Sequence, residues 1–270
     1  MVESRCAEPR AYFTMGNAME KGPPAINLVE LKKVYGDRPA VNGLTLEVPR
    51  GCFFGFLGPN GAGKTTTIRM MMDLVRPTSG SMELLGRPMP RDALEIKRRI
   101  GLVPDESLLF DRLTGPEFLE FVGRMYGLGR GVARDRAREL LALFELESEA
   151  SKLIASYSKG MRKRVAMAAA LIHRPELFLL DEPFEGVDAV GARLMKDILL
   201  GQVRQGATVF LTSHVLEVVE RLCDRVAIIH QGRLVMERSM AELKDTAETL
   251  EDVFVKVVGA ERTAEKLEWL

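Results

Sequence analysis

The feature that most constrains this chain is a glycine-rich run of eight residues, 58–65, between an apolar segment and a helix-like one. The apolar segment, residues 53–57, predicts a buried strand, and residues 64–75 predict a helix. The run itself fits the pattern G-x-x-x-x-G-K-[ST]. Its glycines let backbone N–H groups turn toward phosphate oxygens, and the N-terminus of the following helix adds a favourable dipole. The sequence therefore predicts a phosphate-binding P-loop in an α/β fold.

The P-loop supplies the first candidate site residues. The Lys64 ammonium would neutralise the β- and γ-phosphates of a nucleotide, and the Thr65 hydroxyl would bind Mg²⁺. Lys64 is thus both a nucleotide ligand and a candidate catalytic residue. The predicted nucleotide contacts of this segment are Gly58, Pro59, Asn60, Gly61, Ala62, Gly63, Lys64, Thr65 and Thr66.

A second apolar strand, predicted over residues 177–180, ends in two neighbouring carboxylates. Enzymes that transfer phosphoryl groups place a magnesium-binding carboxylate beside the P-loop. We expect Asp181 to hold the metal through water and Glu182 to polarise the attacking water as general base. Taken alone, this pair could equally be an apolar strand that stops at charges. Its combination with a P-loop favours the catalytic interpretation.

The composition of the chain excludes several classes of protein. It has 270 residues, 46% of them apolar, enough for one large domain or a domain with a sub-domain. Its 38 basic residues balance 38 acidic ones, so no basic excess indicates a nucleic-acid partner. Cys6, Cys52 and Cys223 are too few and too scattered for a disulfide framework or a zinc site. No apolar run approaches the ~18 residues of a membrane span, and we expect a cytoplasmic chain.

The remaining patterns divide the chain. Residues 1–24 lack periodicity and favour a disordered tail, while residues 243–270 favour a C-terminal helical tail capped near Thr249. The segment of about 92–158 looks mainly helical, and Thr114 and Glu117 have the spacing of a capping box. The apolar face predicted for the helix that follows consists of Phe118, Phe121, Val122 and Met125. We expect an α/β fold with a P-loop NTPase core over residues 25–242, an antiparallel β sub-domain and this inserted helical sub-domain.

A further motif, Tyr157-Ser158-Lys159-Gly160-Met161, stands before a predicted helix, 21 residues ahead of Asp181 when counted from Gly160. In sequence and spacing it resembles the signature motif of ABC-type ATPases, whose common form is Leu-Ser-Gly-Gly-Gln. Ser158 and Gly160 match that form, whereas the residues that depart from it are Tyr157, Lys159 and Met161. The resemblance covers about residues 26–242.

Other positions of that family's motif set follow in the same order. Tyr35 stands where the family has an aromatic that stacks on adenine, and Asp188 resembles the family's D-loop aspartate. His214 resembles the switch histidine that contacts the γ-phosphate. One position departs, because Asp105 occupies the place of the family's Q-loop glutamine. The metal contact expected there would come from a shorter, charged side chain.

The resemblance implies an ATP-hydrolysing subunit that uses ATP and Mg²⁺. Two such subunits, identical or different, would close on two ATP molecules, and each signature motif would contact the γ-phosphate held by the other subunit. The implied metal ligands are Thr65, Asp181 and Asp105, and the implied catalytic residues are Lys64, Glu182 and His214. The implied contacts in trans are Ser158, Lys159, Gly160 and Met161.

The signature, Asp105 and the apolar C-terminal helix most resemble ATPases paired with small exporter permeases. The chain would then lie on the inner face of a cell membrane, bound to a transmembrane permease. We expect docking in a groove at about residues 102–113, anchored by Leu108, Leu109 and Phe110. The alternative is that these side chains only pack the sub-domain.

Two other functions use part of this motif set. A non-transport ABC ATPase of DNA repair or translation commonly has two ATPase domains or a long coiled coil, whereas this sequence has one P-loop and no sustained heptads. A small-molecule kinase would use the P-loop without needing the signature motif or Asp188. Transport therefore remains the leading hypothesis.

Overall fold

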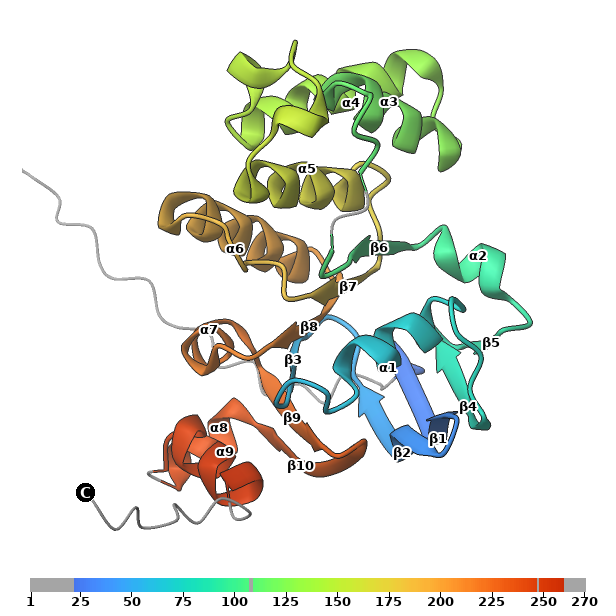
Figure 1. Ribbon diagram of the computed structural model, residues 1–270, viewed down its shortest axis with the longest axis vertical. Helices are drawn as coiled ribbons and strands as arrows, with labels where there is room; N and C mark the ends of the chain where they lie inside the picture. The colour runs from blue at the N-terminus through green and yellow to red at the C-terminus, as the bar shows by residue number, and fades with distance from the viewer. Residues whose placement is uncertain (1–21, 107–108, 247, 260–270) are drawn as a thin grey trace, which may run out of the picture.

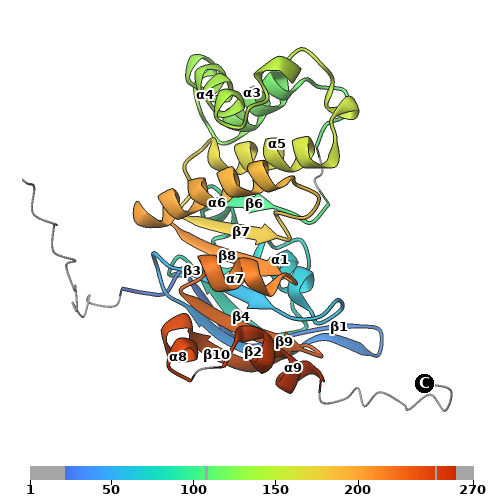
Figure 2. The same cartoon turned by 90° about the vertical axis from the view of Figure 1, so that its left-hand side faces the viewer.

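A parallel β-sheet with helices on both faces forms the centre of the molecule (Figures 1 and 2). The computed structural model describes residues 22–106, 109–246 and 248–259. Most of the predicted N-terminal tail, Leu108 and residues 260–270 lie outside the described residues. None of the helices in the described ranges combines the length and apolar character that a membrane span requires.

The central sheet has the strand order β10-β9-β3-β8-β7-β6, and only the β9–β10 pair within it is antiparallel. Its strands are β3 (Phe53–Leu57), β6 (Ile100–Val103), β7 (Leu177–Asp181), β8 (Thr208–Ser213), β9 (Arg225–His230) and β10 (Arg233–Ser239). The strands predicted over residues 53–57 and 177–180 are confirmed. Because β3, β6, β7 and β8 run parallel, the loops that follow them emerge at one edge of the sheet.

A second, antiparallel sheet covers one face of the first. Its order is β2-β1-β4-β5, formed by β1 (Ile26–Tyr35), β2 (Arg38–Val48), β4 (Ser79–Leu84) and β5 (Arg87–Met89). Helix α1 (Lys64–Met71) packs in the core between the two sheets, where the Phe54 and Phe210 rings stack with their centroids 5.8 Å apart. This arrangement confirms the expected α/β fold with an antiparallel β sub-domain.

Helices cover the other face of the central sheet. The covering helices are α5 (Lys159–Leu171), α6 (Ala189–Arg204) and α7 (Leu216–Leu222). Beyond α5 lie α3 (Gly115–Met125) and α4 (Arg130–Leu143), at the end of the molecule opposite α8 (Met240–Asp245) and α9 (Leu250–Val258) (Figures 1 and 2). Short helix α2 (Ala93–Lys97) precedes β6. The capping box predicted at Thr114 and the helix cap predicted near Thr249 are both present, the latter also as a capping box.

Three sequence expectations need correction. Helix α1 ends at Met71 instead of residue 75, because Asp73 adopts a left-handed backbone with φ of 52° that breaks the helix. The segment 92–158 is not only helical, since β6 belongs to the central sheet, so the inserted helical layer that we propose begins at α3.

The third correction concerns the apolar face of α3. Met125 is 71% exposed and Phe121 is 42% exposed, although both were expected on the buried face. Phe118 is buried and Val122 packs against the core, as expected, but the helix also packs through Leu119 and Gly123. A Cβ on Gly123 would lie 3.1 Å from the Cβ of Ala133. Because α4 approaches closely, the buried face of α3 includes a glycine. A prediction from the spacing of apolar residues does not take glycine into account.

Packing of β6 against the end of α5 makes a stability prediction. A Cβ at Gly101 would lie 2.6 Å from the backbone oxygen of Ala170, so Gly101→Ala should lower the free energy of unfolding by about 1–3 kcal/mol. Gly201, inside α6 with open space around it, is the matched control, and Gly201→Ala should raise stability by up to about 1 kcal/mol. Urea unfolding measures both changes, and equal effects of the two variants would contradict the proposed steric contact.

Candidate nucleotide-binding site

The P-loop lies where its backbone touches two neighbouring strands. A Cβ on Gly58 would meet the carbonyl oxygen of Ile229 at 2.3 Å, and one on Gly63 would meet that of Ala40 at 2.5 Å. Gly63 also has a left-handed φ of 112°. No side chain fits at either position without moving backbone, so both glycines are required sterically. The contacts hold the loop between β2 and β9.

Lys64 is the buried cation of the loop. Its side chain is 7% exposed, and its Nζ donates to the carbonyl oxygens of Gly58 at 2.7 Å and Pro59 at 3.4 Å. Burial lowers the pKa of the Lys64 ammonium, while the charges of Glu182, Asp181 and Asp105 act in the opposite sense. The nearest of these carboxylates is that of Glu182, whose Oε1 lies 3.8 Å from Nζ.

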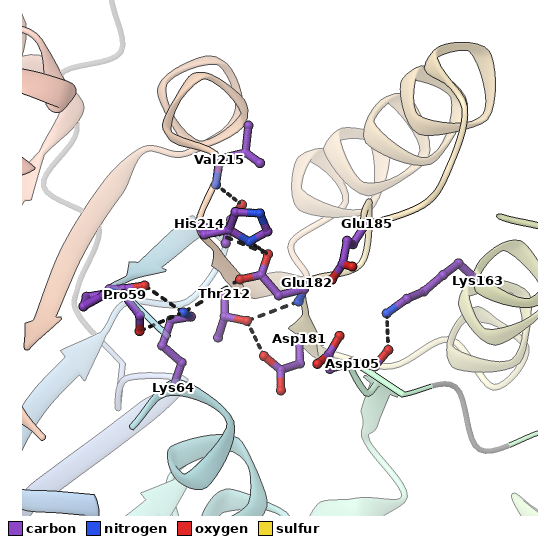
Figure 3. Close-up of polar contacts among 12 residues, drawn as sticks. Pro59, Lys64, Asp105, Lys163, Asp181, Glu182, Glu185, Thr212, His214 and Val215 are labelled. Atoms are coloured by element: carbon purple, nitrogen blue, oxygen red, sulfur yellow. Dashed lines mark hydrogen bonds and ion pairs between the residues drawn. The ribbon is translucent and has the colours of Figure 1, made fainter. Parts of the chain in front are cut away.

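Asp181 and Glu182 end β7 and share one anchor, the hydroxyl of Thr212 on the adjacent strand β8. This hydroxyl donates to Asp181 Oδ1 at 2.5 Å and accepts from the backbone N–H of Glu182 at 3.2 Å (Figure 3). The neighbouring parallel strand therefore orients the Asp181 carboxylate and fixes the backbone at Glu182. Thr212 was not singled out from the sequence; its signal is a polar residue at the carboxyl end of an apolar strand.

Glu182 adopts an unusual backbone conformation, with φ of 45°. Residues other than glycine rarely adopt this left-handed backbone conformation, which costs on the order of 1–3 kcal/mol. The turn aims the Glu182 carboxylate at His214, whose Nδ1 lies 3.0 Å from Oε2 and whose backbone N–H donates to the same oxygen (Figure 3). Its other oxygen, Oε1, is buried without a hydrogen-bond partner within the described residues.

One pocket of about 340 Å³ collects most of the predicted nucleotide-site residues. From the predicted set it is lined by Tyr35, Pro59, Asn60, Gly61, Ala62, Gly63, Lys64, Thr65, Thr66, Asp105, Asp181 and Glu182. Gly58, the first residue of the loop, does not line this pocket, and its carbonyl oxygen accepts a hydrogen bond from Lys64 Nζ. The Tyr35 ring, at the end of β1, is 48% exposed. Strands from both sheets therefore converge on one cavity.

The signature residues and Asp188 do not line this pocket. Ser158 caps α5, and its hydroxyl accepts from the N–H of Met161 at 3.2 Å. Asp188 caps α6, where its carboxylate accepts from the N–H of Gly191 at 2.8 Å, a bond that lowers the pKa of Asp188.

The start of α5 contacts the segment just before α6. A Cβ on Gly160 would lie 3.1 Å from the Gly186 carbonyl oxygen, and Lys159 Nζ lies 2.7 Å from Glu185 Oε1. Tyr157, a departure from the common signature, is 6% exposed and donates from its hydroxyl to the Glu149 carbonyl, which ties the motif to the helical layer.

The pocket has the donor set that Mg²⁺ prefers. Within the described ranges no group of three His, Cys, Asp or Glu side chains could hold a metal ion by themselves. Mg²⁺ is usually bound by one or two carboxylates together with substrate phosphates and water, so a complete protein cage is not needed. Thr65, Asp181 and Asp105 reach one pocket with Lys64, and they fit a metal held together with a nucleotide.

Comparison with known proteins identifies the family. A protein-family model described as ABC transporter matches residues 41–185. The daunorubicin resistance ATP-binding protein DrrA3 of Streptomyces coeruleorubidus is 41% identical over 236 residues, which cover 87% of this chain and 75% of that protein. The chain belongs to the ABC transporter ATP-binding family. As an ABC ATPase it binds and hydrolyses ATP.

Other relatives agree with this assignment. The bacitracin transport ATP-binding protein BcrA of Bacillus licheniformis is 39% identical over 220 residues, covering 81% of this ABC ATPase and 71% of BcrA. A solved ATP-binding subunit of an ABC transporter superposes with a TM-score of 0.80 at 28% identity, over 86% of this chain and 99% of that one. A solved dimeric ATP-binding cassette in a post-hydrolysis state with ADP and Pi superposes with a TM-score of 0.74 at 26% identity. The match covers 80% of this chain and 98% of that cassette. These relatives favour transport over DNA repair or translation.

The Thr212 hydroxyl makes a testable prediction. Thr212→Val keeps the shape but removes the bonds to Asp181 and Glu182, so the free energy of unfolding should fall by about 1–3 kcal/mol and ATP hydrolysis should drop. Thr212→Ser keeps the hydroxyl and should stay within about 1 kcal/mol of the parent. Urea unfolding and phosphate release measure the two effects. A loss in Thr212→Ser as large as that in Thr212→Val would contradict a specific role of the hydroxyl, because Ser keeps it.

Proposed function

We propose that this ABC ATPase is the energy-supplying subunit of an exporter, and that its nucleotide pocket is the catalytic site. The single observation that carries the proposal is the convergence of Lys64, Glu182 and His214 at one edge of the central sheet (Figure 3). The export direction rests on the relatives, which include proteins of daunorubicin resistance, bacitracin transport and Nod factor export.

In this proposal the P-loop holds the phosphates of ATP and Tyr35 stacks on adenine. Lys64, already oriented by two loop carbonyls, exchanges part of that contact for the β- and γ-phosphates. Thr65, Asp181 and Asp105 would hold Mg²⁺, which when bound neutralises phosphate charge as the bond to the leaving group breaks. Each of these residues lines the same pocket, so no large rearrangement is needed.

Glu182 is the proposed general base. Its buried Oε1 has no hydrogen-bond partner in the described chain, which leaves it able to accept a proton from the attacking water. His214, in the tautomer that carries a proton on Nδ1, donates to Oε2 and fixes the direction of the carboxylate. His214 thereby positions the base, and its exposed ring remains available to the γ-phosphate.

The site is completed by a second ATPase subunit. ABC cassettes form dimers and pair with permeases, and one of the solved relatives is a dimer with ADP and Pi. Here Ser158, Gly160 and Asp188 lie outside the pocket of their own chain, at the N-termini of α5 and α6. We propose that they face the ATP of the partner, whether an identical or a different subunit, and stabilise phosphate charge there.

A transmembrane permease is the proposed membrane partner, which would hold the subunit at the inner face of the membrane. Of the three predicted anchors, Leu108 lies outside the described residues, Leu109 packs partly against the core, and Phe110 is 51% exposed. The Phe110 ring lies 5.4 Å from that of Phe121 on α3, and exposed Met125 follows on the same helix. An amphipathic helix of the permease would find an apolar surface here.

The catalytic assignment is tested by two substitutions. Glu182→Gln should keep ATP binding but slow hydrolysis by about 100-fold or more, because a neutral amide cannot accept the proton, and an ATP-bound dimer should accumulate in size-exclusion chromatography. Lys64→Ala should weaken ATP binding by about 10- to 100-fold, since it removes a charged hydrogen-bond donor. Turnover of the Gln variant at the parent rate would remove Glu182 from the mechanism.

The docking surface is tested separately. Replacing Phe110 and Phe121 with Ser should leave ATP hydrolysis by the isolated subunit unchanged but reduce its co-purification with the permease from cells that express both. Val235→Ser is the matched control, because Val235 is also exposed, at 43%, but lies on β10 far from α3 (Figure 1). Equal permease recovery with the double variant and with the control would place the docking site elsewhere.

A further inference from the structure

A second buried lysine lies outside the nucleotide pocket. Lys163 is on α5, five residues after the signature serine Ser158, and is 2% exposed. Its Nζ donates to the backbone carbonyl oxygen of Asp105 at 2.6 Å (Figure 3). It also donates to the backbone carbonyl oxygen of Pro104 at 3.2 Å. Burial lowers the pKa of Lys163, and the charge of Asp105 acts most strongly against this. A buried cation is rare unless such partners compensate it.

These two bonds join parts of the chain with different roles. Asp105 follows β6 and lines the nucleotide pocket together with Lys64 and Asp181. Its backbone carbonyl faces α5, where Lys163 binds it. The same helix begins with the signature motif at Ser158. Lys163 therefore connects the Asp105 loop, which lines the chain's own nucleotide pocket, to helix α5. The N-terminus of α5 is the part that we propose faces the nucleotide of the partner subunit.

The neighbouring residue Arg162 shows that this connection is particular to Lys163. Arg162 lies on the same helix and also bonds a backbone carbonyl, but its partners are Ile154 and Asp111, in the connections that flank the helical layer. Losing Arg162 would remove one cation and its backbone bond from α5 but leave both bonds of Lys163 to the Asp105 loop in place. It is thus a matched control for charge and for helix stability.

We propose that Lys163 is a positioning residue that sets the place of the Asp105 carboxylate for Mg²⁺-ATP and couples this loop to the signature helix. The inference rests on the proposed function, because it assumes that Asp105 contributes to the metal site. Lys163 acts through the backbone of Asp105 and touches neither nucleotide nor metal. An apolar residue could fill the same volume, but it would leave the two carbonyls without this donor.

The first test measures how much Mg²⁺ tightens nucleotide binding. A fluorescent trinitrophenyl-ATP is titrated into the full chain in Mg²⁺ and in EDTA. Lys163→Met should leave the EDTA affinity within about twofold but reduce the Mg²⁺-dependent gain about 10-fold, the effect typical of residues that orient metal ligands. Arg162→Met should keep the full gain.

A double-mutant cycle then asks whether Lys163 acts through Asp105. Asp105→Ala should lose the same Mg²⁺-dependent gain, and adding Lys163→Met to it should cost no more, because coupled residues are not additive. Hydrogen exchange gives a readout independent of nucleotide. Residues 101–106 should exchange faster in Lys163→Met and at the parent rate in Arg162→Met.

Several results would overturn the inference. Equal loss of affinity in Mg²⁺ and EDTA, additive effects of the two substitutions, or a full Mg²⁺ gain in Asp105→Ala would each leave Lys163 with a structural role only. If the Met variant does not fold, Lys163→Gln, which keeps an N–H donor, should show a smaller loss of the Mg²⁺ gain in the same direction, and no loss would contradict the proposal. Failure of the proposed function looks different, since Lys64→Ala would then bind the nucleotide as tightly as the parent.

Discussion

The rest of the site depends on the close contact of the P-loop with the backbones of two neighbouring strands. The P-loop passes so near to the carbonyl groups of Ile229 and Ala40 that Gly58 and Gly63 cannot carry a side chain. This contact locks the loop between the two sheets, and the carbonyl groups of the loop then hold the Lys64 ammonium. Without it, neither the direction of the loop's N–H groups nor the place of the lysine would be set. The parallel sheet adds the remaining chemistry at the same edge.

Buried charge is the second constraint on the molecule. Lys64 and Lys163 are both nearly inaccessible, and each gives its hydrogen bonds to backbone carbonyls while carboxylates lie farther away. Such an arrangement keeps the cations charged without neutralising them by a tight ion pair. At Lys64 the charge lies in the pocket where we propose that phosphate binds. At Lys163 it is used to hold a loop in place, which explains how two buried lysines in one domain can have different tasks.

Much of the fold could be predicted from the sequence, because the spacing of apolar residues in the strands and helices is clear. The strand at residues 53–57 and the capping boxes at Thr114 and Thr249 depend on local chemistry, and the structure has them at those residues. The P-loop residues and Asp181–Glu182 were also found from local patterns, and all of them except Gly58 line one pocket. The prediction for the buried face of α3 was right at Phe118 but wrong at Phe121 and Met125, because that face depends on how closely α4 approaches. Thr212 was missed because its importance comes only from the strand beside it.

What the sequence by itself determined is the set of local elements and the identity of the phosphate-binding and carboxylate motifs. These follow from glycine conformations, apolar periods and caps, all of which act over a few residues. The tertiary structure alone decided which motifs meet. It places Glu182 in contact with His214 and the Asp105 carbonyl in a hydrogen bond with Lys163. It also places Ser158 outside the nucleotide pocket of its own chain. The physical reason is that these contacts join residues far apart along the chain, so they depend on strand order and helix packing, which no local pattern encodes.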